Sequence, residues 1–158
     1  MSIFLKKKGF TLLELMITAA ILIVALIGLL AVYVLCFNIN ETAKNLTLAT
    51  SAIQQKLEEI RDYSFYEIFD ELNNTNFEVS GIPNQDAEGT IRVNTSNPDL
   101  LKITISVSWR QRGGRIIGED NGRGGGIPLN GEIDGTEDVN VNGILDSPAK
   151  IVMRMANK

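Results

Sequence analysis

The chain has 158 residues, 15 of them Lys or Arg and 19 Asp or Glu, which gives a net charge of −4. It contains no histidine, so it lacks the usual general base near neutral pH, and no nucleophile–base pair is recognisable; we expect that it is not an enzyme. From residue 41 onward 12 basic and 18 acidic residues give a net −6, which argues against nucleic acid as a main partner. The single cysteine, Cys36, cannot form an internal disulfide and is interpreted as an ordinary small apolar residue.

Residues 10–37 form an apolar run whose only charged residue is Glu14. As a helix the run would be about 42 Å long, more than a bilayer core requires. Lys6, Lys7 and Lys8 precede it, so we expect a cytoplasmic N-terminus. A cleaved secretory signal has a shorter apolar core, and an uncleaved signal anchor would not explain the acid. Because a carboxylate in a membrane helix costs on the order of 2.5–3.5 kcal/mol at the centre and less near the interface, Glu14 is a functional hypothesis.

The segment KKKGFTLLELMI resembles the processing signature of type IV prepilins and of the pseudopilins of type II secretion. That signature is a short basic leader, a glycine, Phe or Met, then Thr and Leu, with Glu at the fifth position of the mature chain. Here these positions are filled in register by Lys6–Lys8, Gly9, Phe10, Thr11, Leu12 and Glu14.

The resemblance implies that a membrane-embedded prepilin peptidase cuts between Gly9 and Phe10 and methylates the new amine of Phe10. It also implies an assembly role for Thr11 and Glu14. The Glu14 carboxylate would meet the amine of residue 10, its own or a neighbour's, as a subunit enters the filament, and this opposite charge would offset the desolvation of the acid. The alternative for Glu14 is an interfacial acid that snorkels to the lipid headgroups.

A helical pattern continues through residues 38–62, which predicts an amphipathic stem helix. Asn38 and Asn40 suggest a local break where it joins the apolar run. The apolar stripe that defines the stem consists of Leu46, Ala49, Ile53, Leu57 and Ile60.

Residues 63–158 predict a small β-rich head. We expect a short helix over 64–72, a turn at 73–76, and strands over 77–80, 90–94, 100–109, 115–117 and 150–155. In LLKITISVSW, residues 100–109, apolar and polar residues alternate, which is typical of a half-buried strand. The predicted fold class is α+β: a long N-terminal helix packed on a small antiparallel sheet, as in pilins. The expected organisation is a leader (1–9), an assembly helix (10–37), the stem (38–62) and the head (63–158).

Residues 118–148 form a long connection rich in Gly, Asp and Asn. Within it four residues occupy positions 1, 3, 5 and 9 of an EF-hand-like calcium loop, with Gly143 at position 6: Asp138, Asn140, Asn142 and Asp146. Position 12, normally a bidentate Glu, is Ala149. Two interpretations are open, a structural calcium site and a solvated turn cluster in which Asp and Asn bind local backbone groups.

Together these features predict a filament subunit, a minor rather than a major pilin or pseudopilin. It would be made as a single-pass inner-membrane precursor with its head outside the cytoplasm, and would end in a periplasmic or extracellular filament. The resemblance implies other pilin-like subunits, the prepilin peptidase and the inner-membrane assembly platform as partners. No cofactor is expected, apart from structural calcium under the first interpretation of residues 138–146. A type IV pilus and a type II secretion pseudopilus both remain open. The rival interpretation is a monomeric, membrane-anchored binding module that uses its β head and acidic loop.

Overall fold

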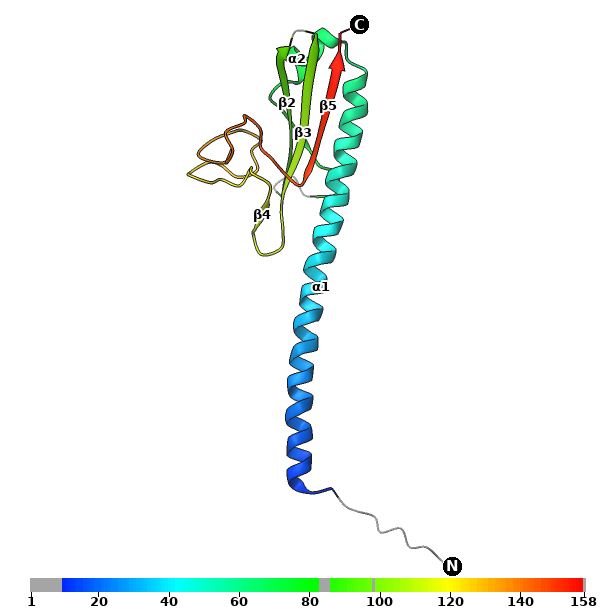
Figure 1. The fold of residues 1–158 in the computed structure, drawn as a ribbon, viewed down its shortest axis with the longest axis vertical. Helices are drawn as coiled ribbons and strands as arrows, with labels where there is room; N and C mark the ends of the chain where they lie inside the picture. Colours follow the sequence, from blue (N-terminus) through cyan, green and yellow to red (C-terminus); the bar gives the residue numbers. More distant parts are fainter. Residues whose placement is uncertain (1–9, 83–85, 98, 158) are drawn as a thin grey trace, which may run out of the picture. The chain divides into compact units, whose positions relative to one another are not determined.

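The computed structural model describes residues 10–82, 86–97 and 99–157 (Figure 1). The predicted leader residues Lys6–Lys8 and the cleavage residue Gly9 lie outside the described residues. The chain divides into two compact units, Met1–Ile39 and Asn40–Lys158. We call the second of these the C-terminal unit.

The first element is one long helix, α1 (Leu12–Arg61, 50 residues). It runs without interruption through Asn38 and Asn40, so the predicted local break is wrong. Asparagine in a helix interior costs less than about 0.7 kcal/mol relative to alanine, which is too little to interrupt a helix of strong formers. Two asparagines without a proline leave every backbone hydrogen bond of the helix available.

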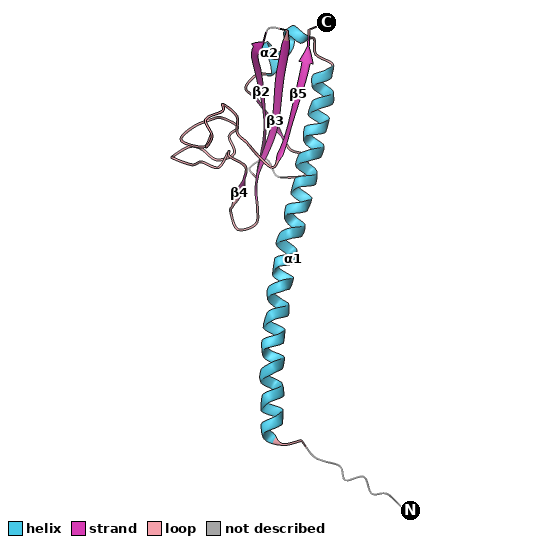
Figure 2. Cartoon of the chain, in the orientation of Figure 1, coloured by secondary structure: helices cyan, strands magenta, loops and turns pink. Residues whose placement is uncertain are grey.

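The C-terminal unit contains a short helix, α2 (Phe65–Leu72), and a five-stranded antiparallel sheet (Figure 2). Its central strand β3 pairs with β2 along one edge and with β4 and β5 along the other, and β1 pairs with the outer edge of β2. The α+β fold, a long N-terminal helix packed against an antiparallel sheet as in pilins, is therefore confirmed. The strands are β1 (Thr75–Glu78), β2 (Ala87–Asn97), β3 (Leu100–Arg110), β4 (Ile116–Ile117) and β5 (Ala149–Ala156).

The core of the C-terminal unit lies between the end of α1 and one face of the sheet. Three residues of the predicted stripe, Ala49, Ile53 and Ile60, are fully buried there, while Leu46 is 38% exposed and the neighbouring Asn45 is buried instead. Because apolar residues spaced three and four apart share one helix face, the stem presents a continuous ridge to the strands. The sheet supplies Ile91, Leu101, Ile103, Ile105, Val107 and Trp109 to the same cluster.

Replacement of Ile53 by alanine tests this packing. The side chain is only 1% exposed, and its truncation leaves a cavity between helix and sheet, so we expect a loss of about 2–5 kcal/mol in unfolding free energy. The single tryptophan, the buried Trp109, reports unfolding in denaturant by its fluorescence. The matched control, Leu46→Ala, removes a partly exposed side chain and should cost clearly less; equal losses would contradict the packing.

Strand β3 differs from its prediction, because it is buried on both faces. Its apolar residues face α1, but Thr104, Ser106 and Ser108 on the opposite face are buried too. The cover is the 118–148 connection: Ser106 Oγ donates to Leu145 O at 2.7 Å, and Gly118 packs so closely that a Cβ there would lie 2.1 Å from Ser108 Oγ. Short hydroxyl side chains suit such a face because they can form local hydrogen bonds, as in the 3.0 Å Thr90–Ser106 contact.

Candidate functional site

The assembly segment predicted from the sequence coincides with the start of α1. Thr11 caps the helix: its Oγ1 accepts a hydrogen bond from Glu14 N at 3.2 Å, and its carbonyl oxygen accepts one from Leu15 N at 3.2 Å. An uncapped N-terminus would leave these donors without a partner. The sequence contains the signal for this cap, because Thr11-x-x-Glu14 is the capping-box pattern. The analysis of the sequence missed it, since both residues had been interpreted through assembly alone.

Glu14 is exposed and lies in the first turn of α1, where the helix dipole favours a negative charge. Among the described residues its carboxylate makes no hydrogen bond or ion pair, whereas its carbonyl accepts a 2.9 Å bond from Thr18 Oγ1. Phe10 immediately precedes the cap and is 79% exposed. The structure thus places Phe10, Thr11 and Glu14 at one helix end with the acid's charge unpaired.

The surface that follows is apolar and uncovered. Every residue from Phe10 to Asn40 is exposed. Within the part of the chain that the structure describes, α1 is the one helix whose length and composition would allow it to cross a membrane; an 18-residue window has a mean hydropathy of 3.0. An apolar surface of this size requires lipid or other protein around it.

The second candidate site is the 118–148 loop, which is held to the outer face of the sheet, the face directed away from α1. Arg92 Nη2 donates to Gly131 O at 2.8 Å, and Asn76 Nδ2 donates to Asn130 O at 2.8 Å. The two ends of the loop are joined by two hydrogen bonds. Glu119 N donates to Asp146 O at 2.8 Å, and Asp146 N donates to Glu119 Oε2 at 2.9 Å. The first and last parts of the loop are therefore tied together beside the strands.

The four residues predicted as calcium ligands lie together in a hydrogen-bonded turn. Asp138 accepts backbone N–H groups on both carboxylate oxygens, from Asn142 at 3.0 Å and Gly143 at 2.7 Å. Asp146 Oδ2 accepts from the side-chain amides of Asn140 at 2.9 Å and Asn142 at 3.1 Å. This is the arrangement of the turn cluster, in which the oxygens bind N–H groups of the loop.

A cation already lies against this turn. The Lys150 ammonium pairs with Asp146 Oδ1, and this pairing with the amide contacts lowers the pKa of the Asp146 carboxyl, although burial opposes the shift. Among the described residues no group of three or more His, Cys, Asp or Glu side chains has the arrangement of a metal site. For calcium to bind here, Asp146 would have to exchange the ammonium for the metal ion.

A buried acidic group in the same loop was missed by the sequence analysis. Asp120 and Glu137 are fully buried, and Asp134 lies beside Glu137. Asp120 is satisfied by backbone donors, Gly131 N at 2.9 Å and Asn130 N at 3.3 Å. Asp134 Oδ1 and Glu137 Oε2, however, are buried without a donor. No sequence pattern marks this group, because its members come together only when the loop folds.

One proton between Asp134 Oδ1 and Glu137 Oε2 would give both of these buried oxygens a hydrogen-bond partner. Burial raises the pKa of Glu137 to about 7, and the hydrogen bond with Asp134 and the charge of Asp120 act in the same direction, against the backbone N–H of Gly122. The pKa of Asp134 is lowered by its bond from Ile127 N at 3.0 Å and by the contact with Glu137. A proton on Glu137, donated to Asp134, would satisfy both of these oxygens.

Another acid with a raised pKa, Glu88, lies close to this group. Glu88 is half-buried on β2, directly opposite Glu78 on β1. Burial, the charge of Asp120 and the charge of Glu78 raise the pKa of Glu88 to about 7. Like charges opposite each other on neighbouring strands destabilise a sheet, so protonation of Glu88 relieves this contact.

These shifts predict a stability that falls as the pH rises. Glu88 and Glu137 have folded-state pKa values above the ordinary 4.5, so their contribution is complete below about pH 4.5 and is lost as the pH passes about 7. We expect the midpoint of denaturant unfolding, followed by Trp109 fluorescence, to decrease between about pH 5 and about pH 8. The double variant E88Q/E137Q should flatten this dependence, and an unchanged slope would contradict the assignment.

The comparisons with known proteins identify the N-terminal segment. Residues 5–30 match the family described as the prokaryotic N-terminal methylation motif. The match spans the basic residues, the cap at Thr11, the acid at Glu14 and the first half of the exposed apolar surface, and it confirms the resemblance recognised in the sequence. No curated protein and no solved structure matches the chain.

Proposed function

We propose that this chain is a non-enzymatic subunit of a membrane-assembled filament. The methylation motif supports this, because it is the motif of type IV pilin-like and pseudopilin-like precursors. The single observation that carries the proposal is the matched motif at residues 5–30 at the head of a helix whose apolar residues are all exposed as far as Ile39. Processing between Gly9 and Phe10 and methylation of the Phe10 amine would convert the membrane-inserted precursor into the assembling form.

In assembly, the exposed apolar residues of α1 would exchange lipid for the helices of neighbouring subunits. The Glu14 carboxylate would then move from the aqueous interface into the packed helices. Burial of a charged carboxylate there without a partner is costly. Pairing with the Phe10 amine of the same or a neighbouring subunit would offset that cost. Its carboxylate, which has no partner among the described residues, and its place beside the N-terminus of α1 support this role. Glu14 would therefore set the register of a subunit in the filament and perform no chemistry.

We place the chain among minor subunits, in a type IV pilus or a type II secretion pseudopilus. Its partners would be other pilin-like subunits, the prepilin peptidase and the inner-membrane platform. The filament would lie in the periplasm or outside the cell, with the C-terminal unit outside the cytoplasm.

Isolation from cells that build such filaments tests the proposal. The tagged full chain should fractionate with sheared or sedimented filaments in cells with prepilin peptidase, and remain in the membrane fraction in cells without it. The competing function, a monomeric anchored binding module, predicts membrane fractionation in both strains. The positive control is a resident filament subunit followed in the same fractions.

We also propose that the turn at residues 138–146 binds calcium weakly, in the millimolar range that suits an extracellular structural site. The geometry supports a weak site because the Lys150 ammonium occupies the Asp146 carboxylate. Lys150→Gln should therefore raise the calcium affinity several-fold, measured by isothermal titration of the full chain in detergent. Lys44→Gln, an exposed lysine on α1, is the control and should leave the affinity unchanged; absence of calcium binding in both variants would refute the site.

A further inference from the structure

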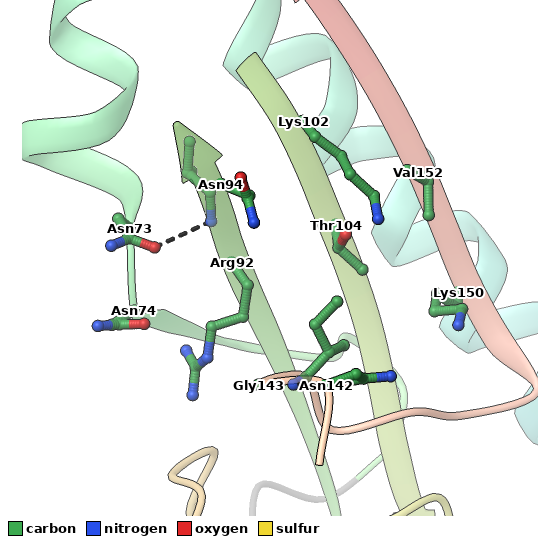
Figure 3. Close-up of a pocket in the computed structure, with 12 residues that line it drawn as sticks. Asn73, Asn74, Arg92, Asn94, Lys102, Thr104, Asn142, Gly143, Lys150 and Val152 are labelled. Atoms are coloured by element: carbon green, nitrogen blue, oxygen red, sulfur yellow. Dashed lines mark hydrogen bonds between the residues drawn. The ribbon is translucent and has the colours of Figure 1, made fainter. Parts of the chain in front are cut away.

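The outer face of the sheet carries a second feature that the filament role does not use. A pocket of about 400 Å³ opens on this face over β2, β3 and β5, and its lining includes the 142–144 turn and, beside β2, Asn73 and Asn74 (Figure 3). A volume of this size is typical of small-molecule sites, which range over roughly 300–1,000 Å³.

The pocket is basic although the protein is acidic. Arg92 on β2, Lys102 on β3 and Lys150 on β5 contribute to its lining, which contains no Asp or Glu among the described residues. Figure 3 shows these three side chains around one opening. Two of them already have partners, because Arg92 donates to Gly131 O and Lys150 pairs with Asp146. Among the described residues Lys102 has none, and it is exposed.

The register of the strands concentrates positive charge beside Lys102. Arg154 of β5 lies directly opposite Lys102 in the pairing of β3 with β5, and is exposed on the same face. Like charges in directly opposed positions destabilise a sheet. An anion bound between Lys102 and Arg154 would remove this repulsion, so anion binding there would stabilise the sheet.

The remaining polar groups are those that bind hydroxyls. The lining includes four asparagines, Asn73, Asn74, Asn94 and Asn142, and the buried hydroxyl of Thr104. Asn73 Oδ1 accepts a 2.9 Å bond from Val93 N, which fixes that amide and leaves its NH₂ group to donate (Figure 3). Asn142 is already engaged, because its Oδ1 accepts from Ile144 N and its Nδ2 donates to Asp146, and Asn94 Oδ1 accepts from Ser96. Among the described residues the NH₂ groups of Asn73, Asn74 and Asn94 remain to donate to the hydroxyls of a ligand.

Aromatic side chains are absent from the described lining. Sequence-tolerant binding of single-stranded nucleic acid depends on aromatic stacking of its bases together with a positively charged groove, and only the second condition is met here. The combination of cations, amides and one hydroxyl instead matches a compact group that carries an oxyanion beside hydroxyls.

We propose that this pocket binds an acidic sugar residue, with its carboxylate or sulfate at Lys102 and its hydroxyls at the asparagine amides. The net acidic charge of the C-terminal part of the chain repels anions at long range, so attraction is local to the pocket and falls with salt. The site lies on the sheet face turned away from α1 and leaves the assembly segment unused. It therefore gives the subunit a saccharide-binding function in addition to the proposed filament role.

The test titrates the full chain in a non-ionic detergent with four probes: an oligogalacturonate, a neutral oligogalactose of equal length, inorganic phosphate and a single-stranded oligonucleotide. We expect the oligogalacturonate to bind and the neutral sugar not to bind. Lys102→Gln should weaken binding about ten- to hundredfold, because it removes a charge-assisted hydrogen bond. Lys44→Gln, which removes the same charge from an exposed position on α1, should have no effect.

Both lysines are exposed, so circular dichroism should show an intact fold in each variant. Three results would overturn the proposal: no binding of the oligogalacturonate, equal binding by Lys102→Gln and wild type, or tighter binding of phosphate or of the oligonucleotide. The titration does not depend on filament assembly. A negative titration therefore leaves the filament role intact, and a chain that does not enter filaments can still be tested for saccharide binding.

Discussion

A Glu14→Ala chain will be processed as efficiently as the wild type but will be excluded from filaments. Removal of the carboxylate leaves the Phe10 amine without its counter-charge when the helices pack together. Loss of one partner of a buried ion pair costs about 3–5 kcal/mol, which corresponds to a loss of more than about a hundredfold in incorporation. The measurement is the ratio of filament-bound to membrane-bound chain, with N-terminal mass spectrometry of both fractions.

Two further substitutions sharpen this result. Glu14→Gln keeps the shape and loses the charge, so it should behave like alanine, whereas Glu14→Asp should retain part of the incorporation. Glu58→Ala is the matched control, because Glu58 lies on the same helix and forms only an exposed ion pair with Arg61. Wild-type incorporation of Glu14→Ala would refute the register role and leave Glu14 as an interfacial acid at the helix cap.

The second large effect concerns processing. Co-produced with a prepilin peptidase, the wild-type chain should yield an N-terminal peptide that begins at N-methylated Phe10. Gly9→Val should abolish this product, since a branched side chain next to the scissile bond blocks the close approach of a backbone that glycine allows. Mass spectrometry of the N-terminal peptide distinguishes the forms, and the substituted chain should retain its leader.

Lys8→Gln provides the control for this experiment. It changes the leader by one charge and leaves two lysines, which is enough to favour the expected cytoplasmic N-terminus, so cleavage should continue. An uncleaved wild-type chain in the presence of the peptidase would contradict the filament proposal and favour the anchored binding module. In that case the pocket and the loop of the C-terminal unit would become the working parts of the protein.

The N-terminal segment could be interpreted from the sequence because its properties are local. A basic leader, Gly9, Phe10 and Glu14 stand at fixed offsets, and a peptidase that binds an extended segment recognises such offsets directly. Membrane insertion likewise depends on the summed hydropathy of successive residues. The stem was predictable for a similar reason, since the 3.6-residue period places Ala49, Ile53 and Ile60 on one helix face before any tertiary contact is known.

Strand β3 marks the limit of this kind of inference. Its alternation correctly predicts a strand and identifies the face that packs on α1, because side-chain direction alternates along any strand. It cannot reveal that Ser106 is covered by Leu145, 39 residues later. Burial of the polar face depends on where a long loop returns, and short hydroxyl residues are compatible with either outcome.

Tertiary structure alone therefore decided the chemistry of the outer sheet face. The pKa of Glu137 is raised because loop closure buries this carboxyl beside Asp134 and Asp120. The basic pocket exists because the sheet brings Arg92, Lys102 and Lys150 to one face while the 142–144 turn supplies a wall. The sequence by itself determined the methylation motif and the membrane-length apolar helix, since both depend on consecutive residues. Folding determined the charges and cavities of the C-terminal unit, because these depend on distances between residues far apart in the chain.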